Sequence, residues 1–107
     1  MSSVSIMKTK ANVNVASAGT AVAIAATSVV AQSCIIQALD TNTGAVYVGD
    51  SSVLASDKRG VKLVAGAALP LTADAMGGGV GVLDLSTIYV DAVNNNDKVS
   101  IIYLARP

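Results

Sequence analysis

The sequence predicts an all-β, single-domain fold, a β-sandwich or jelly-roll-like barrel of about seven or eight short antiparallel strands. Two observations predict this fold class. Polar and apolar residues alternate along several short segments, as they do in half-buried strands. Turn-forming residues separate these segments at intervals of about 8–12 residues, which is typical of sandwiches and barrels. The chain also lacks glutamate, a strong helix former, so its composition does not favour helices.

The N-terminal part of the chain, residues 1–31, has the least regular pattern. Residues 12–15 and 20–25 alternate in the manner of strands. Residues 16–31 are rich in alanine, which suits a helix, but their valine and threonine content favours strand. We therefore interpret residues 1–31 as an N-terminal arm or the first strands, and residues 32–107 as the sandwich body of the same domain.

Turn signals divide the body. Residues 40–44 (Asp-Thr-Asn-Thr-Gly) end on a glycine that can take a positive φ, which predicts a hairpin between strands at 34–39 and 45–49. The segments 57–60 and 94–97 are predicted to make the same kind of connection.

The closing strand has a different pattern from the others. Residues 98–104 begin as alternation and end in the four apolar residues 101–104 (Ile-Ile-Tyr-Leu). A short continuous apolar run is typical of a strand that is covered on both faces. We therefore expect this strand to be covered on both faces.

Tyr47 and Tyr89 are the candidate interface residues. Each is out of phase with the aliphatic residues of its own strand, so each should face away from the core. Exposed tyrosine is typical of interfaces, because its apolar ring and its polar hydroxyl are both useful there. The alternative is that both rings cover the outer face of a sheet.

The composition argues against catalysis. The chain has no histidine, the usual general base and the commonest metal ligand, so a Ser-His-Asp triad is impossible. A Ser–Lys dyad built on Lys58, Lys62 or Lys98 is the remaining nucleophilic arrangement, and nothing singles out one of these lysines. We therefore predict a protein that is not an enzyme, has no catalytic or metal-binding residues and uses no cofactor.

Charge and hydropathy indicate the kind of partner. Seven basic and seven acidic residues are scattered along the chain, without a basic stripe that would bind nucleic acid. No apolar run reaches the roughly 18 residues of a membrane span. The chain is 52% hydrophobic but only 3% aromatic, so a monomer would have a thin core. Because a net charge near zero also favours association, we predict a homo-oligomer.

Four further segments have a simple structural interpretation. Cys34 is expected to be a buried, unreactive thiol. Residues 40–44 resemble the start of a calcium loop, but Ser51 stands where that loop needs a bidentate glutamate, so a turn is favoured. Residues 94–97 could offer oxygen ligands to a cation, and here too a solvated turn is favoured. The glycine-rich segment 76–81 is predicted to be a flexible loop, because no phosphate-binding frame surrounds it.

Residues 35–50 read Ile-Ile-Gln-Ala-Leu-Asp-Thr-Asn-Thr-Gly-Ala-Val-Tyr-Val-Gly-Asp. This block resembles small structural proteins of tailed-phage virions, in which a strand, an Asn-Thr-Gly turn and a Tyr-Val-Gly strand follow one another. The segments 60–66, 84–90 and 99–104 continue the resemblance, which covers roughly residues 32–105.

The resemblance implies a β-rich structural module of a phage particle. We expect a capsid decoration (cement) protein, a homotrimer on the head surface that binds between subunits of the major capsid protein after synthesis in the host cytoplasm. Two alternatives remain open. One is a head-fibre or tail component, and the other is a glycan-binding adhesive module in which Tyr47, Tyr89 and residues 94–97 form the sugar platform.

Overall fold

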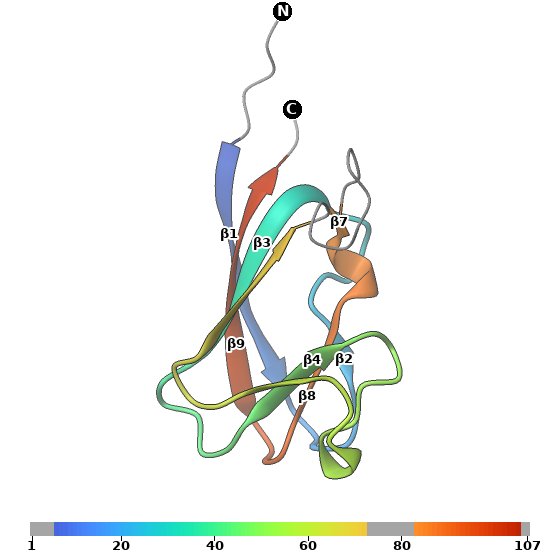
Figure 1. Ribbon diagram of the computed structural model, residues 1–107, viewed down its shortest axis with the longest axis vertical. Coiled ribbons are helices and arrows are strands. Elements are labelled where there is room, and N and C mark those ends of the chain that lie inside the picture. The colour runs from blue at the N-terminus through green and yellow to red at the C-terminus, as the bar shows by residue number, and fades with distance from the viewer. Residues whose placement is uncertain (1–5, 73–82, 106–107) are drawn as a thin grey trace, which may run out of the picture.

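The computed structural model describes residues 6–72 and 83–105, and it confirms the predicted all-β single domain. Two antiparallel sheets stack as a sandwich (Figure 1). The strands within the described residues are β1 (Ile6–Val15), β2 (Val22–Ala23), β3 (Val30–Ala38), β4 (Val46–Gly49), β5 (Val61–Leu63), β6 (Ala68–Thr72), β7 (Leu83–Asp84), β8 (Tyr89–Ala92) and β9 (Asp97–Ala105). Two single-turn 3₁₀ helices, η1 (Ala55–Asp57) and η3 (Leu85–Thr87), precede β5 and β8.

The larger sheet has the strand order β1-β9-β3-β6, with β7 paired to the beginning of β3. Its three main strands are nine or ten residues long, which is longer than the short strands that the sequence predicts. The closing strand β9 lies between β1 and β3. Its core side is buried, but Ile102 and Leu104 on its other side are half-buried, so the expected cover on both faces is only partly found in the described residues. β1 begins and β9 ends at the same end of the molecule (Figure 1).

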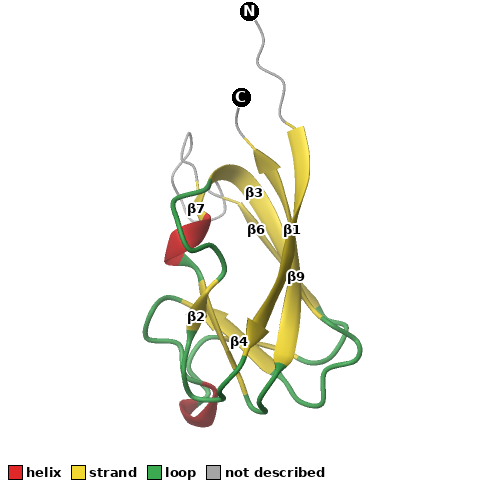
Figure 2. Ribbon diagram, turned by 180° about the vertical axis from the view of Figure 1, so that it is seen from behind, coloured by secondary structure: helices red, strands yellow, loops and turns green. Residues whose placement is uncertain are grey.

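The smaller sheet has the order β2-β8-β4-β5 and covers the lower part of the larger one (Figure 2). Its strands are at most four residues long. β4 and β5 pair directly, so the predicted turn at residues 57–60 lies in the connection between two neighbouring strands.

The main core fills the space between the sheets. Alternation places Ile36, Val99 and Ile101 of the larger sheet opposite Val46 and Val90 of the smaller one. Aliphatic side chains and alanines supply almost all of this core, as the low aromatic content predicts.

The predicted hairpins at residues 40–44 and 94–97 are wrong. β3 and β4 lie in different sheets, and so do β8 and β9, so both segments carry the chain across the sandwich. Turn-forming residues indicate where a chain reverses, but they do not determine which sheet receives the next strand. Here the two crossings are adjacent, and side chains from each bind the backbone of the other.

The N-terminal part is only partly regular. Residues 6–15 form β1, which pairs with β9 at the edge of the larger sheet. Residues 1–5 lie outside the described residues. Residues 16–29 form no helix, and their only strand is β2, which contributes two residues to the smaller sheet. The predicted loop at residues 76–81 also lies outside the described residues.

Candidate functional site

Tyr47 and Tyr89 lie on the side of the smaller sheet that faces away from the main core, as their phase predicts. They belong to a second, small apolar cluster with Val53 and Ala55, residues of the connection between β4 and β5. Tyr47 is only 5% exposed, so the expectation that its ring is exposed is wrong. The connection folds back over the ring, and a pattern within one strand cannot reveal such a cover. Tyr89 is half-buried.

Asp91 holds this cover in place. Its carboxylate is fully buried and accepts hydrogen bonds from the backbone N–H groups of Gly19 at 2.9 Å and Ala55 at 2.8 Å. The smaller sheet is thereby tied both to the segment before β2 and to η1. Asp91 was not predicted as a structural residue, because a single aspartate in an alternating strand is expected to face outward.

The oxygen-rich segments at 40–44 and 94–97 bind each other. The Asp97 carboxylate is nearly buried and accepts from the N–H groups of Thr43 at 3.0 Å and Gly44 at 2.9 Å. The Asn42 amide pairs with the backbone of Lys98 through both of its polar ends. These hydrogen bonds explain the segments as braced crossings. Within the described ranges, no group of three or more acidic, cysteine or histidine side chains could hold a metal ion.

The proposed sugar platform is not assembled from its predicted parts. Tyr47 is covered, and the side chains of Asn94 and Asn95 are engaged with Thr43 and the backbone of Ala18. The polar groups of residues 94–97 therefore serve the loops around them.

Cys34 and the lysines lie apart from one another. Cys34 faces the main core, and burial raises the pKa of its thiol to about 11, as expected for an unreactive cysteine. Lys58 ends η1, Lys62 is exposed on β5, and Lys98 donates to the backbone oxygen of Asn96. Among the hydrogen bonds of residues 6–72 and 83–105, none joins a lysine Nζ to a serine hydroxyl.

The side of the larger sheet that faces away from the core carries an uncharged and partly apolar surface. Cross-strand pairing sorts its side chains into three rows that run across β1, β9, β3 and β6. We call these rows the outer face. They contain Met7, Leu104, Ser33 and Thr72, then Thr9, Ile102, Ile35 and Pro70, and finally Ser100, Gln37 and Ala68.

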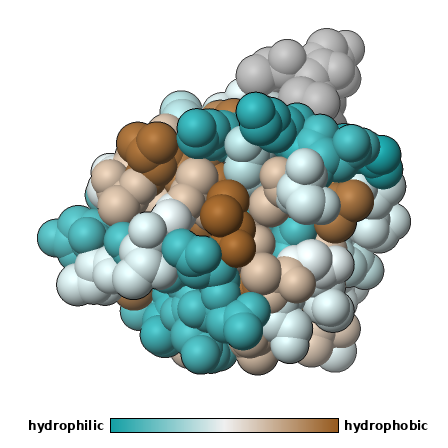
Figure 3. Space-filling view, turned by 90° about the horizontal axis from the view of Figure 1, so that it is seen from below, coloured by the Kyte–Doolittle hydropathy of each residue, from teal (hydrophilic) through white to brown (hydrophobic). Residues whose placement is uncertain are grey.

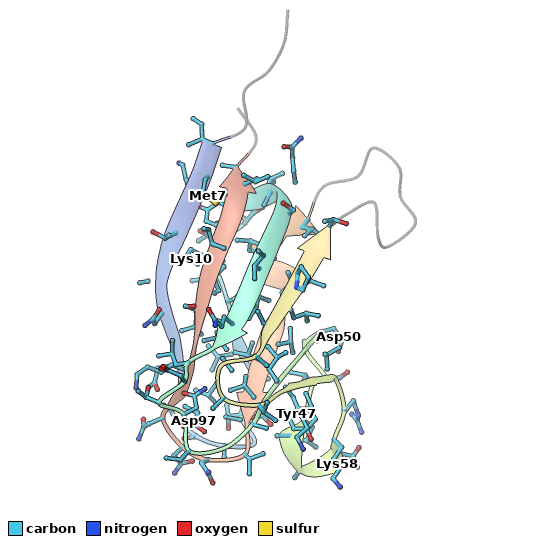
Figure 4. The ribbon with its side chains drawn as sticks, turned by 60° about the vertical axis from the view of Figure 1, so that its left-hand side comes forward. Met7, Lys10, Tyr47, Asp50, Lys58 and Asp97 are labelled. Carbon is cyan, nitrogen blue, oxygen red and sulfur yellow. The ribbon has the colours of Figure 1, made fainter. Side chains whose placement is uncertain are left out.

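No residue in these three rows is charged. Met7 and Ile35 are 59% and 44% exposed, and Ile102 and Leu104 are half-buried. A hollow of about 360 Å³ lies over the lower rows, lined by Ile35, Ile102 and neighbouring polar residues. Figure 4 looks onto this sheet, with Met7 on β1 and with Asp50 and Lys58 away from its strands.

The other surfaces differ from the outer face. At the lower end of the molecule, apolar side chains are scattered among hydrophilic ones (Figure 3). The connection between β4 and β5 carries charges of both signs, including the exposed ion pair of Asp57 and Arg59. Isolated apolar side chains are normal on protein surfaces, whereas a contiguous uncharged patch is typical of interfaces. The outer face is therefore the candidate site.

Comparison with known proteins finds no matching family model, no matching curated protein and no matching solved structure. The described part of the chain also contains no helix with the length and hydropathy needed to cross a membrane.

Proposed function

We propose that this chain is a non-enzymatic structural protein of a phage particle, and specifically a capsid decoration protein. In this role it sits on the head surface between subunits of the major capsid protein. The observation that carries the proposal is the uncharged outer face, which spans four strands of one sheet. Such a face suits a protein that works inside an assembly, where it buries surface against a copy of itself or against another protein.

The resemblance to small virion proteins supports the particle assignment. Its central block, residues 35–50, runs from the outer face through a braced crossing into the smaller sheet. Ile35, the first residue of that block, lies in the middle row of the outer face, and the next residue, Ile36, faces the core. The block therefore contributes to the fold and to the proposed contact surface at once.

A decoration protein acts mechanically. Each copy covers a seam between capsid subunits, and the apolar area that it buries contributes a gross stabilisation of roughly 25 cal/mol for each Å², from which the entropy costs of association are subtracted. A modest contribution from each copy adds up over a shell, and so resists expansion by the packaged genome. This mechanism needs surface and rigidity, and it needs no reacting group.

Copy number and position on the particle test the proposal. Quantitative mass spectrometry of purified virions should find this chain in a fixed ratio to the major capsid protein, and electron cryomicroscopy should place its density on the head. A few copies per particle, or density on the tail, would reject decoration in favour of a fibre or tail component. Absence from virions would reject the particle assignment altogether.

The glycan-binding alternative has its own measurement. A glycan array with the purified chain should show no binding, because Tyr47 is covered and the side chains of residues 94–97 bind neighbouring loops. Binding that is lost in Tyr89→Ala would favour the adhesive module over the decoration protein.

A further inference from the structure

We propose that the outer face packs against the same face of another copy of this chain. The inference rests on the proposed assembly role and deepens it, because it assigns the surface through which copies meet. Contacts with the major capsid protein would then use other surfaces.

The first argument is the pattern of β9. Four successive apolar residues, 101–104, are typical of a strand covered on both faces. In the single chain Ile101 is buried in the core, but Ile102 and Leu104 on the outer face are only half-buried. The sequence therefore has the composition of a covered strand on a side that residues 6–72 and 83–105 do not fully cover. A second protein surface would complete that burial.

The absence of charge on the outer face also favours a second copy as the partner. The three rows carry no charged residue, so two copies can meet there without like-charge repulsion. Lys98 lies one row below, and Lys10 borders the hollow at the β1 edge. A strongly charged partner, such as nucleic acid or an acidic protein, would find little to pair with. Ser100, Ser33 and Gln37 can donate and accept hydrogen bonds, so a copy of the face can supply partners to itself.

The third argument concerns the edge of the same sheet. β1 is an edge strand, and two copies could in principle extend the sheet by pairing their β1 strands. A two-fold pairing centred on Thr9 would place Lys8 of each copy opposite Lys10 of the other. Like charges directly opposite each other destabilise a strand pair, and lysines on edge strands commonly prevent this kind of contact. The edge therefore opposes self-association, whereas the face permits it.

The outer side of the larger sheet approaches the size of a stable interface, and the three uncharged rows are the upper part of this side. β9 has nine residues, so the whole side is about 30 Å long, and four strands make it about 19 Å wide. Its projected area is roughly 500 Å² because β6 is shorter, and the side-chain relief adds accessible area. Stable interfaces bury about 800 Å² per partner. Two such sheets would pack about 10 Å apart with aligned strands.

A matched pair of substitutions tests the proposal in the isolated full chain. Ile35→Asp places a carboxylate in the middle row, whereas Val61→Asp makes a similar change at a similarly exposed strand residue of the smaller sheet. Because the same face on both copies makes a two-fold contact, sedimentation equilibrium should give a wild-type mass of twice the 10.6 kDa of one chain. Ile35→Asp should raise the dissociation constant at least about 30-fold, as loss of a central contact does, and Val61→Asp should leave it unchanged. Circular dichroism checks that both variants fold.

A cross-linking measurement keeps the test independent of folding defects. Because Cys34 is buried, Ser100→Cys would provide the accessible thiol on the outer face, and Ser52→Cys would provide one in the connection between β4 and β5. A short bis-maleimide should cross-link copies of Ser100→Cys and not of Ser52→Cys. Equal cross-linking of the two variants, or a monomeric wild-type chain at all concentrations, would overturn the inference.

The two proposals can fail separately. A chain that is monomeric in solution but abundant on virions would refute the contact between copies and leave the decoration role standing. A chain that associates through the outer face but is absent from virions would refute the decoration role alone.

Discussion

Removing the Asp97 carboxylate at the beginning of β9 should destabilise the fold. Asp97 accepts hydrogen bonds from the N–H groups of Thr43 at 3.0 Å and Gly44 at 2.9 Å, at the point where the two crossings between sheets meet. A hydrogen bond to a charged group contributes about 1.5–3 kcal/mol. The site is partly buried, so water can replace some of the lost contacts. We therefore expect Asp97→Ala to lower the free energy of unfolding by about 3 kcal/mol.

Urea unfolding followed by circular dichroism measures this loss. With a slope of about 1 kcal/mol per molar urea, typical of the lower range for small proteins, the midpoint should fall by about 3 M. Asp40→Ala is the matched control, because Asp40 is exposed in the same crossing, and its midpoint should change by less than about 0.5 M. All variants should be compared at one protein concentration, since association shifts apparent stability. If Asp97→Ala and Asp40→Ala unfold at the same midpoint, the bracing role of Asp97 is refuted.

Three further predictions concern single residues. Gly60→Ala should lower the free energy of unfolding by about 2–4 kcal/mol in the same urea assay, because Gly60 has a φ of 116° and a Cβ there would lie 2.7 Å from a backbone oxygen. Gly66→Ala is the control and should lower the free energy of unfolding by less, because Gly66 has a φ of 84° but open space around it. The pKa of Asp84 is lowered from 3.8 to about 2, mainly by the hydrogen bond from Ser28. This carboxylate therefore stabilises the fold above pH 3.8, and its contribution disappears as the pH falls towards 2. Asp84→Asn should flatten that part of a curve of stability against pH, and an unchanged curve would contradict the assignment. Cys34 should react with a disulfide reagent only after denaturation, and rapid labelling of the native chain would show that its thiol is accessible.

The sequence predicts the strands well because alternation is a local property. The segments in which Tyr47 and Tyr89 alternate with aliphatic residues contribute to strands, and so do residues 98–104. The aliphatic neighbours of both tyrosines face the main core. The pairing of strands is not local, which is why the hairpins at 40–44 and 94–97 are wrong. An Asp-Thr-Asn-Thr-Gly turn is compatible with a tight hairpin and with a crossing between sheets, and the choice depends on partners more than 50 residues away in sequence.

The candidate site shows the same limit. The phase of Tyr47 was predictable from its neighbours, but its burial depends on Val53 and Ala55, which reach it from the connection between β4 and β5. The outer face escaped sequence analysis for the opposite reason. Ile35 and Ile102 are one apolar residue each in separate strands, and only the register places them side by side. A site made of rows across strands has no continuous sequence motif.

The core of the sandwich explains only part of the apolar run of β9. A central strand needs apolar residues on its core side, and the smaller sheet accounts for Ile101. It does not account for Ile102 and Leu104, because a solvated outer face would tolerate polar residues there at no cost to the fold. Nearby positions on the same face, Ser100 and Ser33, are polar, so the pattern is not a general preference of this sheet. Ile35 and Ile102 lie together in the middle row, and hydroxyl side chains lie beside them. This arrangement supports the proposed contact, because interfaces commonly have an apolar centre and a polar rim.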